Sequence, residues 1–577
     1  MKTFINPVST QVNPDPYIME FEGAYYCYAT GSNGINLSVS QDLVSWNYLG
    51  FAYGNSTEKE YWAPSVIYLN GLFFLYYSSS IAQGEECLKL AVSSSPKGPF
   101  SFAKQFFPYF SIDSQPVFWE GQLFMFYSTN TYSGTKDNRP GTSILLDRMC
   151  SPYEFEGHAK PVVFPTLDRE IFQRNRFGDG RDWHTIEGPS FLANGKNLCL
   201  MYSANAYVNE DYFINFSIGV ATHDLRDVAW RKYPDEYTPY ALLEKNEMVS
   251  GTGHNSVAKA PNLLDDWIVY HGRDATLPLD RDKEQRVLRI DRLYQDGAAL
   301  VCFGPSFSAT QYPAEPDLNL HNVLLNNEQK LLFDDECFIS QFWLKAVIAH
   351  SGATYGVALA YSDEKNCHLL QFTAGTDSVL FLQIEKGISN TREVIPLPDS
   401  FDYACSHKVQ ILRNFTYWAV FLDDTVLLET FLDTEGKTGV FARYSRLIIP
   451  SLRMTRAMDL QGKSLQCLGK VFSFMETLEL EGSGVFVKKD RFIPCQMDFS
   501  FGLTLLPCAS SSYVAILDEM DEEVIRLVLD RKRTIYFGLM NDELQVRFGN
   551  SFESKKLKGY SLLMEHVVIE RVRTTKI

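Results

Sequence analysis

Short apolar segments separated by turn-forming residues run along most of the chain. They are rich in Tyr, Phe, Val and Ile, and they end at Gly, Pro, Asn or Asp. Apolar positions that recur with the period of an α-helix are hard to find. Alternating or continuous apolar runs bounded by turn residues are typical of β-strands. The pattern therefore predicts an all-β fold.

A hairpin pattern repeats five times in the first half of the chain. Each repeat has a short apolar strand, a turn containing Gly or Asn, and a second, aromatic strand. Further apolar segments at 35–40, 88–93, 141–146 and 218–222 give each repeat about four strands, as in a propeller blade. We expect a five-bladed β-propeller over residues 1–305. The five repeats begin at Asp15, Trp62, Asp113, Glu187 and His254.

The second half is again β-rich but lacks this repeat. Prolines and small residues after Gly304 indicate a linker at 306–317. Segments such as 338–347 and 355–361 alternate as the strands of a sandwich do. We expect lectin-like or jelly-roll β-sandwiches at 318–460 and 461–577. One large sandwich over 318–577 is the alternative.

Charge and composition exclude several classes of protein. The 577 residues carry a formal net charge of −17, and no basic cluster offers a nucleic-acid footprint. No long apolar run suggests a membrane span, and the first residues lack the apolar core of a secretory signal. The 11 cysteines form no CxxC pair, which argues against a zinc site or a disulfide framework. We expect a cytoplasmic protein with reduced thiols.

Three carboxylates open the repeats, and this is the strongest chemical signal. The inner strand of each blade lines the channel of a propeller, so Asp15, Asp113 and Glu187 are expected at one mouth. Like charges destabilise one another there, which favours a functional reason. Glycoside hydrolysis needs two carboxyl groups, and Trp62 and Trp183 suit stacking on a sugar ring. A metal site and ordinary turn-forming roles are the alternatives.

The five motifs together resemble glycoside hydrolase family 43, five-bladed propellers that cleave arabinosides and xylosides. The matching segments are 13–18, 62–66, 112–116, 185–189 and 251–256. The resemblance implies an inverting mechanism. Asp15 would be the general base, Glu187 the general acid, and Asp113 the residue that orients the acid and modulates its pKa.

Other residues take roles from the same resemblance. His254 would contact a calcium or sodium ion in the channel, mostly through water. Arg286, or alternatively Arg289, would bind the substrate, with His271 on the same rim. In the segment 174–184, Trp183 and His184 are candidates for contact with the sugar. The simpler interpretation of that segment is a solvated loop whose arginines pair with nearby aspartates such as Asp179 and Asp182.

The expected function is an inverting exo-glycosidase that releases a terminal α-L-arabinofuranose or β-D-xylose from an oligosaccharide. Enzymes of this fold that act on β-D-galactofuranosides or fructosides, and glycoside phosphorylases, are the alternatives. A propeller that binds carbohydrate without cleaving it is the non-enzymatic alternative. The sequence leaves open the glycone, the linkage, the preferred chain length, homo-oligomerisation, the role of the sandwiches and any requirement for a metal.

Overall fold

The computed structural model describes almost all of the first 456 residues. It covers 2–456 apart from 82–83, 132–134, 137, 281–282, 297–298, 335–336, 349, 399–400, 415 and 433–435, and beyond 456 it describes the strands β38–β46. The described secondary structure consists of strands and two short 3₁₀ turns, η1 (Asp168–Glu170) and η2 (Leu225–Asp227). No helix in these ranges is long and apolar enough to cross a bilayer. The all-β prediction is confirmed.

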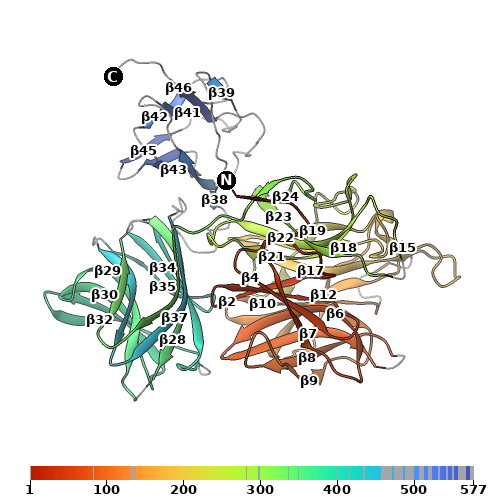
Figure 1. Cartoon of the computed structure of the whole chain (residues 1–577), viewed down its shortest axis with the longest axis horizontal. Coiled ribbons are helices and arrows are strands. Elements are labelled where there is room, and N and C mark those ends of the chain that lie inside the picture. Colours follow the sequence, from red (N-terminus) through yellow and green to blue (C-terminus); the bar gives the residue numbers. More distant parts are fainter. Residues whose placement is uncertain are drawn as a thin grey trace.

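Five antiparallel sheets follow one another along the first 302 residues (Figure 1). Blade 1 contains β2 (Tyr17–Phe21), β3 (Ala24–Ala29), β4 (Ile35–Ser40) and β5 (Asn47–Tyr53). Blade 2 contains β6 (Lys59–Leu69), β7 (Leu72–Ser80), β8 (Cys87–Ser93) and β9 (Ser101–Gln105). Blade 3 contains β10 (Ser111–Trp119), β11 (Gln122–Thr129), β12 (Ser143–Ser151), β13 (Glu154–Phe155) and β14 (Lys160–Val163). Blade 4 contains β17 (Ile186–Asn194), β18 (Asn197–Ala204), β19 (Phe213–Val220) and β20 (Arg231–Lys232). Blade 5 contains β21 (Val249–Lys259), β22 (Asp266–Asp274), β23 (Val287–Asp296) and β24 (Ala299–Cys302).

The first strands of the five blades form a closed ring. Each of β2, β6, β10, β17 and β21 contacts the next, and β21 contacts β2. The N-terminal segment ties blade 1 to blade 5, since the Asn6 amide donates to the Ile290 carbonyl at 2.7 Å and the Val8 N–H donates to the Leu288 carbonyl at 3.0 Å. The expected five-bladed propeller is confirmed.

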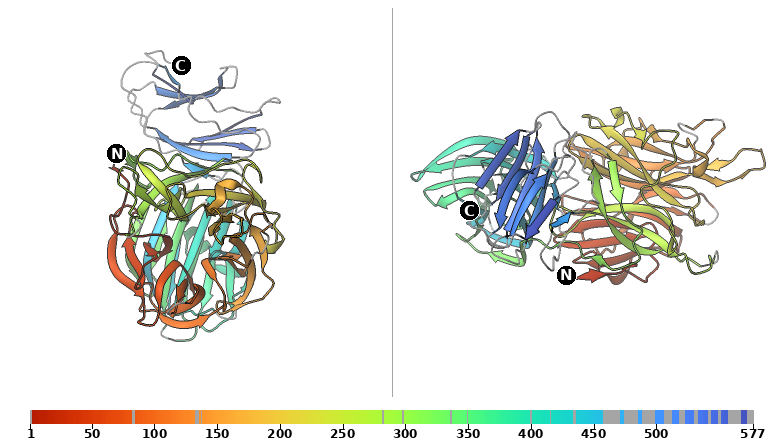
Figure 2. Two further views of the ribbon diagram at one scale, coloured as in Figure 1. Left: turned by 90° about the vertical axis from the view of Figure 1, so that its right-hand side faces the viewer. Right: turned by 90° about the horizontal axis from the view of Figure 1, so that it is seen from above.

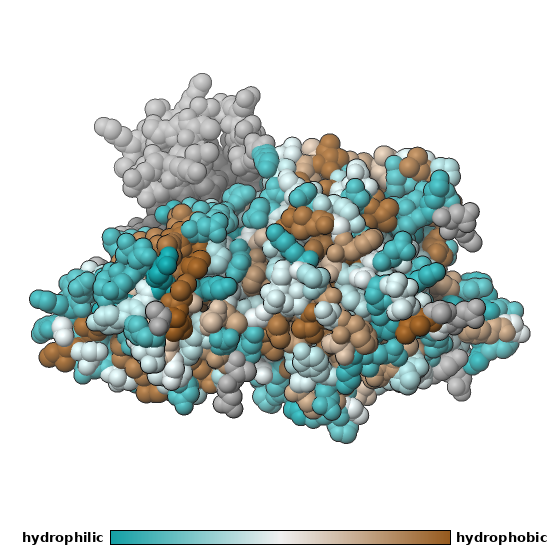
Figure 3. Space-filling model, turned by 60° about the horizontal axis from the view of Figure 1, so that its bottom comes forward, coloured by the Kyte–Doolittle hydropathy of each residue, from teal (hydrophilic) through white to brown (hydrophobic). Residues whose placement is uncertain are grey.

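Aromatic strands fill the space between blades. Blades 1 and 2 share a core in which Tyr28, Tyr61 and Tyr77 are fully buried, and the Tyr61 and Tyr77 rings stack at 5.9 Å. Large rings suit this space because each one covers a wide apolar area with few rotatable bonds. On the face drawn in Figure 3, apolar side chains form separate groups among polar ones. The high aromatic content therefore serves mainly the interior.

The segment 318–456 forms two packed six-stranded sheets. The first contains β26 (Leu318–Leu325), β37 (Arg446–Arg456), β28 (Cys337–Val347), β33 (Ser406–Asn414), β34 (Tyr417–Leu422) and β35 (Thr425–Phe431). The second contains β27 (Lys330–Phe333), β36 (Lys437–Arg443), β29 (Thr354–Asp363), β30 (Asn366–Thr373), β31 (Ser378–Glu385) and β32 (Ile388–Pro396). Buried Phe342, Val357 and Trp418 belong to their shared core. This is the expected β-sandwich.

The first sandwich sheet packs against the hairpin turns of the propeller (Figures 1 and 2). Trp343 on β28 lies against Phe21, with ring centroids 4.7 Å apart, and its indole N–H donates to Glu20 at 3.1 Å. Arg453 on β37 is buried and donates to the Tyr25 hydroxyl at 3.2 Å. These turns lie at the opposite end of β2 from Asp15, so the contact leaves the acidic end of the inner strands uncovered.

The expected linker follows the surface of the propeller. Within it, β25 (Thr310–Gln311) pairs with β1 (Thr3–Phe4), and the Tyr312 N–H donates to the Lys2 carbonyl at 3.1 Å. Two more sheets lie beyond residue 456. Their strands are β38 (Val471–Ser473), β39 (Val485–Val487), β40 (Phe499–Leu505), β41 (Ser512–Leu517), β42 (Glu523–Leu529), β43 (Arg533–Met540), β44 (Glu543–Phe548), β45 (Ser551–Lys556) and β46 (Val567–Arg571). The predicted division near residue 460 lies outside the described residues and stays a prediction.

Candidate active site

The inner strands begin with a shared backbone irregularity. In blades 2 to 5 the inner strand advances three residues while its partner advances two, which is a β-bulge. The bulged residue adopts a positive φ in every case, and the equivalent residue of blade 1 does the same. The five φ values are 54° at Asp15, 41° at Ala63, 59° at Asp113, 62° at Gly188 and 41° at His254. Bulges re-aim side chains, and here they turn Asp15, Asp113 and His254 toward one another.

The predicted alignment of the repeats was wrong by one residue in two blades. Trp62 and Glu187 were expected in the position of Asp15 and Asp113, but Ala63 and Gly188 occupy it. Trp62 pairs with Ser78 and Glu187 with Ser203, one step earlier in the ladder. A step of one residue turns a side chain to the other face of a strand. Glu187 therefore reaches the site from a different direction than the two aspartates.

Asp15 is held from three sides. Its Oδ2 accepts a hydrogen bond from the Thr30 hydroxyl at 2.6 Å, and its Oδ1 accepts one from Arg286 Nη1 at 3.1 Å. Its backbone N–H donates to Nδ1 of His271 at 3.1 Å. His254 Nδ1 lies 3.5 Å from Oδ1. These contacts fix both the carboxylate and the peptide that carries it.

Arg286 supplies the guanidinium group that contacts Asp15. It donates Nε and Nη2 to the two oxygens of Glu284 at 2.9 and 2.7 Å, which leaves Nη1 for Asp15. The guanidinium also lies 5.0 Å from the centre of the Tyr207 ring. The alternative candidate, Arg289, instead donates to the Ser306 carbonyl at 3.4 Å. Arg286 is thus the one of the two that contacts Asp15.

Asp113 is buried beside the backbone that carries Glu187. Its Oδ2 accepts the Gly188 N–H at 2.9 Å and lies 4.0 Å from His254 Nδ1. Burial, and then the charges of Glu187 and Asp15, hold the pKa of Asp113 well above its usual range. Protonation of Asp113 is therefore coupled to that of Glu187.

Glu187 is half-buried, and within the described part of the chain its direct polar partner is Tyr212. The Tyr212 hydroxyl donates to Oε1 at 2.8 Å. Burial raises the pKa of Glu187 to about 7, the hydrogen bond from Tyr212 lowers it, and the nearby charge of Asp15 raises it. A carboxyl group with this pKa is about half protonated at pH 7 and largely protonated below it, which suits a general acid.

Tyr212 and His271 connect the surroundings of the two carboxyl groups. Their rings are parallel within 3° with centroids 5.9 Å apart, and both side chains are fully buried. A Cβ added at Gly253 would lie 1.9 Å from Cε1 of Tyr212. Only glycine at that position leaves room for the tyrosine ring.

His254 lies between the two aspartates. Its backbone N–H donates to the Ser203 hydroxyl at 2.7 Å, and burial lowers the pKa of its imidazole. Among the described residues, no group of three or more His, Cys, Asp or Glu side chains is arranged to hold a metal ion. A hydrated ion contacted by His254 stays a prediction.

The remaining predicted residues, Trp62, Trp183 and His184, have different surroundings. Trp62 is half-buried on blade 2, at the ladder position that Glu187 occupies on blade 4. Trp183 is buried against Phe177 with ring centroids 5.3 Å apart, in β16 (Trp183–His184), which pairs with β15 (Ile171–Gln173). His184 is buried with Nδ1 near the Asp182 carbonyl at 3.1 Å. Contact of these three with a sugar stays a prediction.

The arginine-rich loop before Glu187 pairs internally. Arg174 contacts Asp182 at 2.9 Å and Arg181 contacts Asp179 at 2.7 Å. All four groups are at least partly exposed, so these pairs contribute little to stability. The pairing is the one that the simpler interpretation of the loop predicted.

Sequence reasoning missed four residues of the site: Thr30, Tyr207, Tyr212 and Glu284. Glu284 had a signal, because residues two apart on an extended segment share a face and Glu284 precedes Arg286 by two. Thr30 and Tyr212 had none. Each reaches the site from a neighbouring strand or loop whose local sequence contains no motif.

Comparison with known proteins agrees with this geometry. The family model for glycosyl hydrolases family 43 matches residues 4–298, about half of the chain and nearly the whole propeller. The chain therefore belongs to glycosyl hydrolases family 43.

Two relatives and one solved structure illustrate the likeness. The chain is 22% identical over 300 residues to an extracellular exo-α-(1→5)-L-arabinofuranosidase of Streptomyces avermitilis, a match covering 47% of this chain and 56% of the relative. It is 24% identical over 319 residues to the β-D-galactofuranosidase xynD of Aspergillus niger, covering 51% of this chain and 83% of the relative. A crystal structure of a thermostable family-43 glycoside hydrolase is 28% identical, with a TM-score of 0.47, and covers 54% of this chain and 100% of its own. The chain thus spans little more than half the length of the first relative.

Proposed function

We propose that the chain is an inverting exo-glycosidase that releases a terminal pentose, as α-L-arabinofuranoside or β-D-xyloside, from oligosaccharides. The observation that supports this most is the contrast between two carboxyl groups at one end of the channel. Asp15 is paired with the Arg286 guanidinium at 3.1 Å, whereas Glu187 has a pKa raised to about 7. One group suits a base and the other an acid at the same pH.

In the proposed reaction, Asp15 takes a proton from a water molecule as the water oxygen attacks the anomeric carbon. Glu187 gives its proton to the glycosidic oxygen as the bond from that oxygen to the anomeric carbon breaks. The products are a free sugar of inverted anomeric configuration and the shortened oligosaccharide. One proton is taken up and one is released, so the two carboxyl groups exchange states and must re-equilibrate with solvent before the next turnover.

The neighbouring groups have supporting roles in this proposal. Arg286 holds the Asp15 carboxylate in place. Asp113 accepts the Gly188 N–H and so fixes the peptide beside Glu187. The charge of Glu187, together with burial, keeps the pKa of Asp113 raised, so a neutral Asp113 can stand beside the acid without adding a second negative charge.

A β-D-galactofuranoside is the second candidate substrate. It is favoured by the relative named β-D-galactofuranosidase, since the match covers 83% of that protein. Arabinofuranose and galactofuranose share a five-membered ring, so pocket shape around the exocyclic carbon would distinguish them.

A panel of 4-nitrophenyl glycosides tests the proposal: α-L-arabinofuranoside, β-D-xyloside, β-D-galactofuranoside and β-D-fructofuranoside. We expect turnover of one pentoside, with loss in Asp15→Asn of about a hundredfold or more, the usual contribution of a general base. Turnover only with added phosphate would instead indicate a phosphorylase. The absence of turnover on every glycoside and on arabino- and xylo-oligosaccharides would contradict the proposal.

A further inference from the structure

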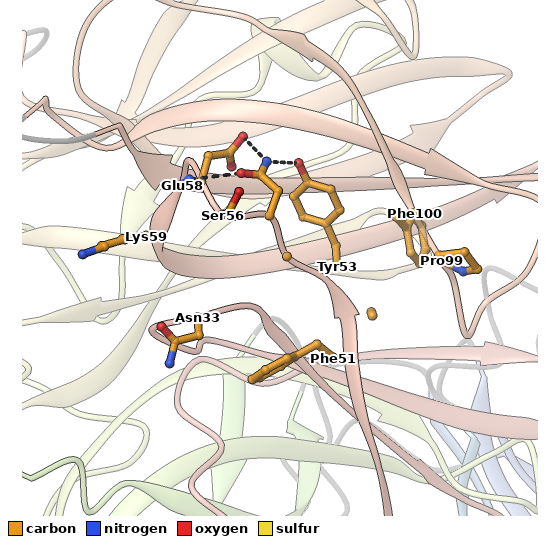
Figure 4. Close-up of a pocket in the computed structure, with 11 residues that line it drawn as sticks. Asn33, Phe51, Tyr53, Ser56, Glu58, Lys59, Pro99 and Phe100 are labelled. Atoms are coloured by element: carbon orange, nitrogen blue, oxygen red, sulfur yellow. Dashed lines mark hydrogen bonds between the residues drawn. The ribbon is translucent and has the colours of Figure 1, made fainter.

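A pocket between the outer parts of blades 1 and 2 has no role in the proposed chemistry. Its volume is about 550 Å³, within the range of roughly 300–1,000 Å³ typical of ligand pockets. The residues that line it include Asn33, Phe51, Tyr53, Asn55, Glu58 and Lys59 (Figure 4). We propose that this pocket binds a neutral sugar ring of an oligosaccharide whose terminal residue occupies the channel. The inference deepens the proposed function and rests on it for the identity of the substrate.

The pocket has an aromatic platform. Phe51 on β5 is 54% exposed, although large aromatic side chains are usually well covered. A Cβ added at Gly34 would lie 2.8 Å from Cγ of this ring. The ring therefore rests on bare backbone on one side and offers its other side to solvent. The face of an aromatic ring is electron-rich, and it suits the C–H groups of a sugar ring.

Tyr53, Asn55 and Glu58 on the wall of the pocket have polar partners within the protein. The Asn55 amide donates to the Tyr53 hydroxyl at 2.8 Å and to Glu58 at 3.0 Å. Glu58 is buried and also accepts from Ser79 at 2.7 Å, with Lys89 Nζ 3.7 Å away. The charge of Glu58 is therefore balanced within the protein, and this wall does not require a cationic ligand.

Two polar side chains at the opening remain available. The Lys59 ammonium and the Asn33 amide are exposed and make no side-chain hydrogen bond or ion pair within the described chain. Asn33 lies beside Phe51 in Figure 4, whereas Lys59 extends outward at the left of the view. An aromatic face beside a few uncommitted donors and acceptors matches the alternating apolar and hydroxyl faces of a sugar.

Strand β6 and the segment around Gly31 link the pocket to the candidate active site. Lys59 and Trp62 lie on the same strand, three residues and about 10 Å apart. The backbone of Gly31 exchanges two hydrogen bonds with Tyr61, both at 3.0 Å. Gly31 follows Thr30, which donates to Asp15. An oligosaccharide leaving the channel mouth over Trp62 would reach Phe51 within a few sugar units.

The test compares Phe51→Ala with Phe102→Ala. Phe102 lies on β9, is 51% exposed and does not line the pocket, so it matches Phe51 in size and exposure. Turnover is measured on a 4-nitrophenyl pentoside and on arabino- and xylo-oligosaccharides of increasing length. We expect Phe51→Ala to raise the ratio of the KM for long substrates to the KM for the aryl pentoside about fivefold, close to 1 kcal/mol of binding energy. Phe102→Ala should leave the ratio unchanged.

Calorimetric titration of the same oligosaccharides in an Asp15→Asn background gives a readout that does not need turnover. Weaker binding of long oligosaccharides in Phe51→Ala alone supports the pocket, even if the aryl glycosides are not cleaved and the proposed hydrolase fails. Equal affinities and equal KM ratios in the two phenylalanine variants overturn the pocket while leaving the hydrolase standing. Preferential binding of uronic acid-substituted oligosaccharides through Lys59 would overturn the neutral-sugar assignment.

Discussion

At the scale of single residues, environment separates carboxyl groups that are chemically alike. Asp15 faces a guanidinium and a hydroxyl, whereas Asp113 and Glu187 share a buried region with few donors. Desolvation penalises a charge that has no partner, and an opposite charge compensates for it. The sequence predicted which carboxyl groups would meet because each follows a motif. It could not predict their environments, which depend on Thr30 and Tyr212 from other segments.

Tyr212 should set the pH at which the acid loses its proton. Its hydroxyl donates to the ionised form of Glu187, which lowers the pKa of that group. Glu187 must be protonated to act, so kcat/KM falls as the pH rises through this pKa. Tyr212→Phe removes the lowering contribution, and the basic limb of the pH profile should move to higher pH by about one unit.

Tyr202→Phe is the matched control for this experiment. The Tyr202 hydroxyl accepts from Asn215 at 3.3 Å inside blade 4. Its loss should leave the position of the basic limb unchanged. A limb that stays in place, or moves to lower pH, in Tyr212→Phe would contradict the role given to this tyrosine.

At the scale of the element, a repeated bulge organises the site. Strand repeats were readable from the alternation of apolar residues and turns, and four strands per blade followed from spacing. The bulge could not be predicted from the sequence, because one extra residue in a strand does not change the composition of that strand. That is why Glu187 and Trp62 were aligned one residue out of register.

The room that Gly253 leaves for Tyr212 gives an element-scale prediction. Gly253→Ala places a Cβ 1.9 Å from the tyrosine ring, which must move away from Glu187. We expect kcat to fall about a hundredfold, the loss that a misplacement of about 1 Å can cause. Circular dichroism should show an intact fold. Gly84→Ala, whose Cβ would meet only the Ile81 carbonyl at 3.2 Å, should retain full activity, and equal activity in the two variants would contradict the steric argument.

At the scale of the whole molecule, the propeller and the first sandwich share a well-packed contact. The order of a propeller followed by a sandwich was predictable from the loss of the repeat after residue 305. The surface on which the sandwich packs was not predictable, because Glu20 and Trp343 are more than 300 residues apart in the sequence. The sequence of the propeller's hairpin turns contains no pattern that predicts which surface packs against them.

Trp343→Ala should uncouple these two parts. The side chain is 3% exposed and packs on Phe21 and Tyr68. Its removal should cost about 3–5 kcal/mol, as for other large-to-small core changes. Differential scanning calorimetry should then resolve separate transitions for the propeller and the sandwich. The control is Phe431→Ala, at a side chain that is 71% exposed. An unchanged thermogram in Trp343→Ala would show that the contact adds no stability.

The most direct test of the assigned acid and base compares two leaving groups on one glycone. Wild type, Asp15→Asn and Glu187→Gln are assayed on a 4-nitrophenyl glycoside and on the oligosaccharide with the same terminal sugar. Nitrophenolate leaves with little help from an acid, whereas a sugar alkoxide needs a proton. We predict that Asp15→Asn loses about a hundredfold or more on both substrates, and that Glu187→Gln loses that much only on the oligosaccharide. Equal losses in Glu187→Gln on the two substrates, or full activity in Asp15→Asn, would contradict the assignment.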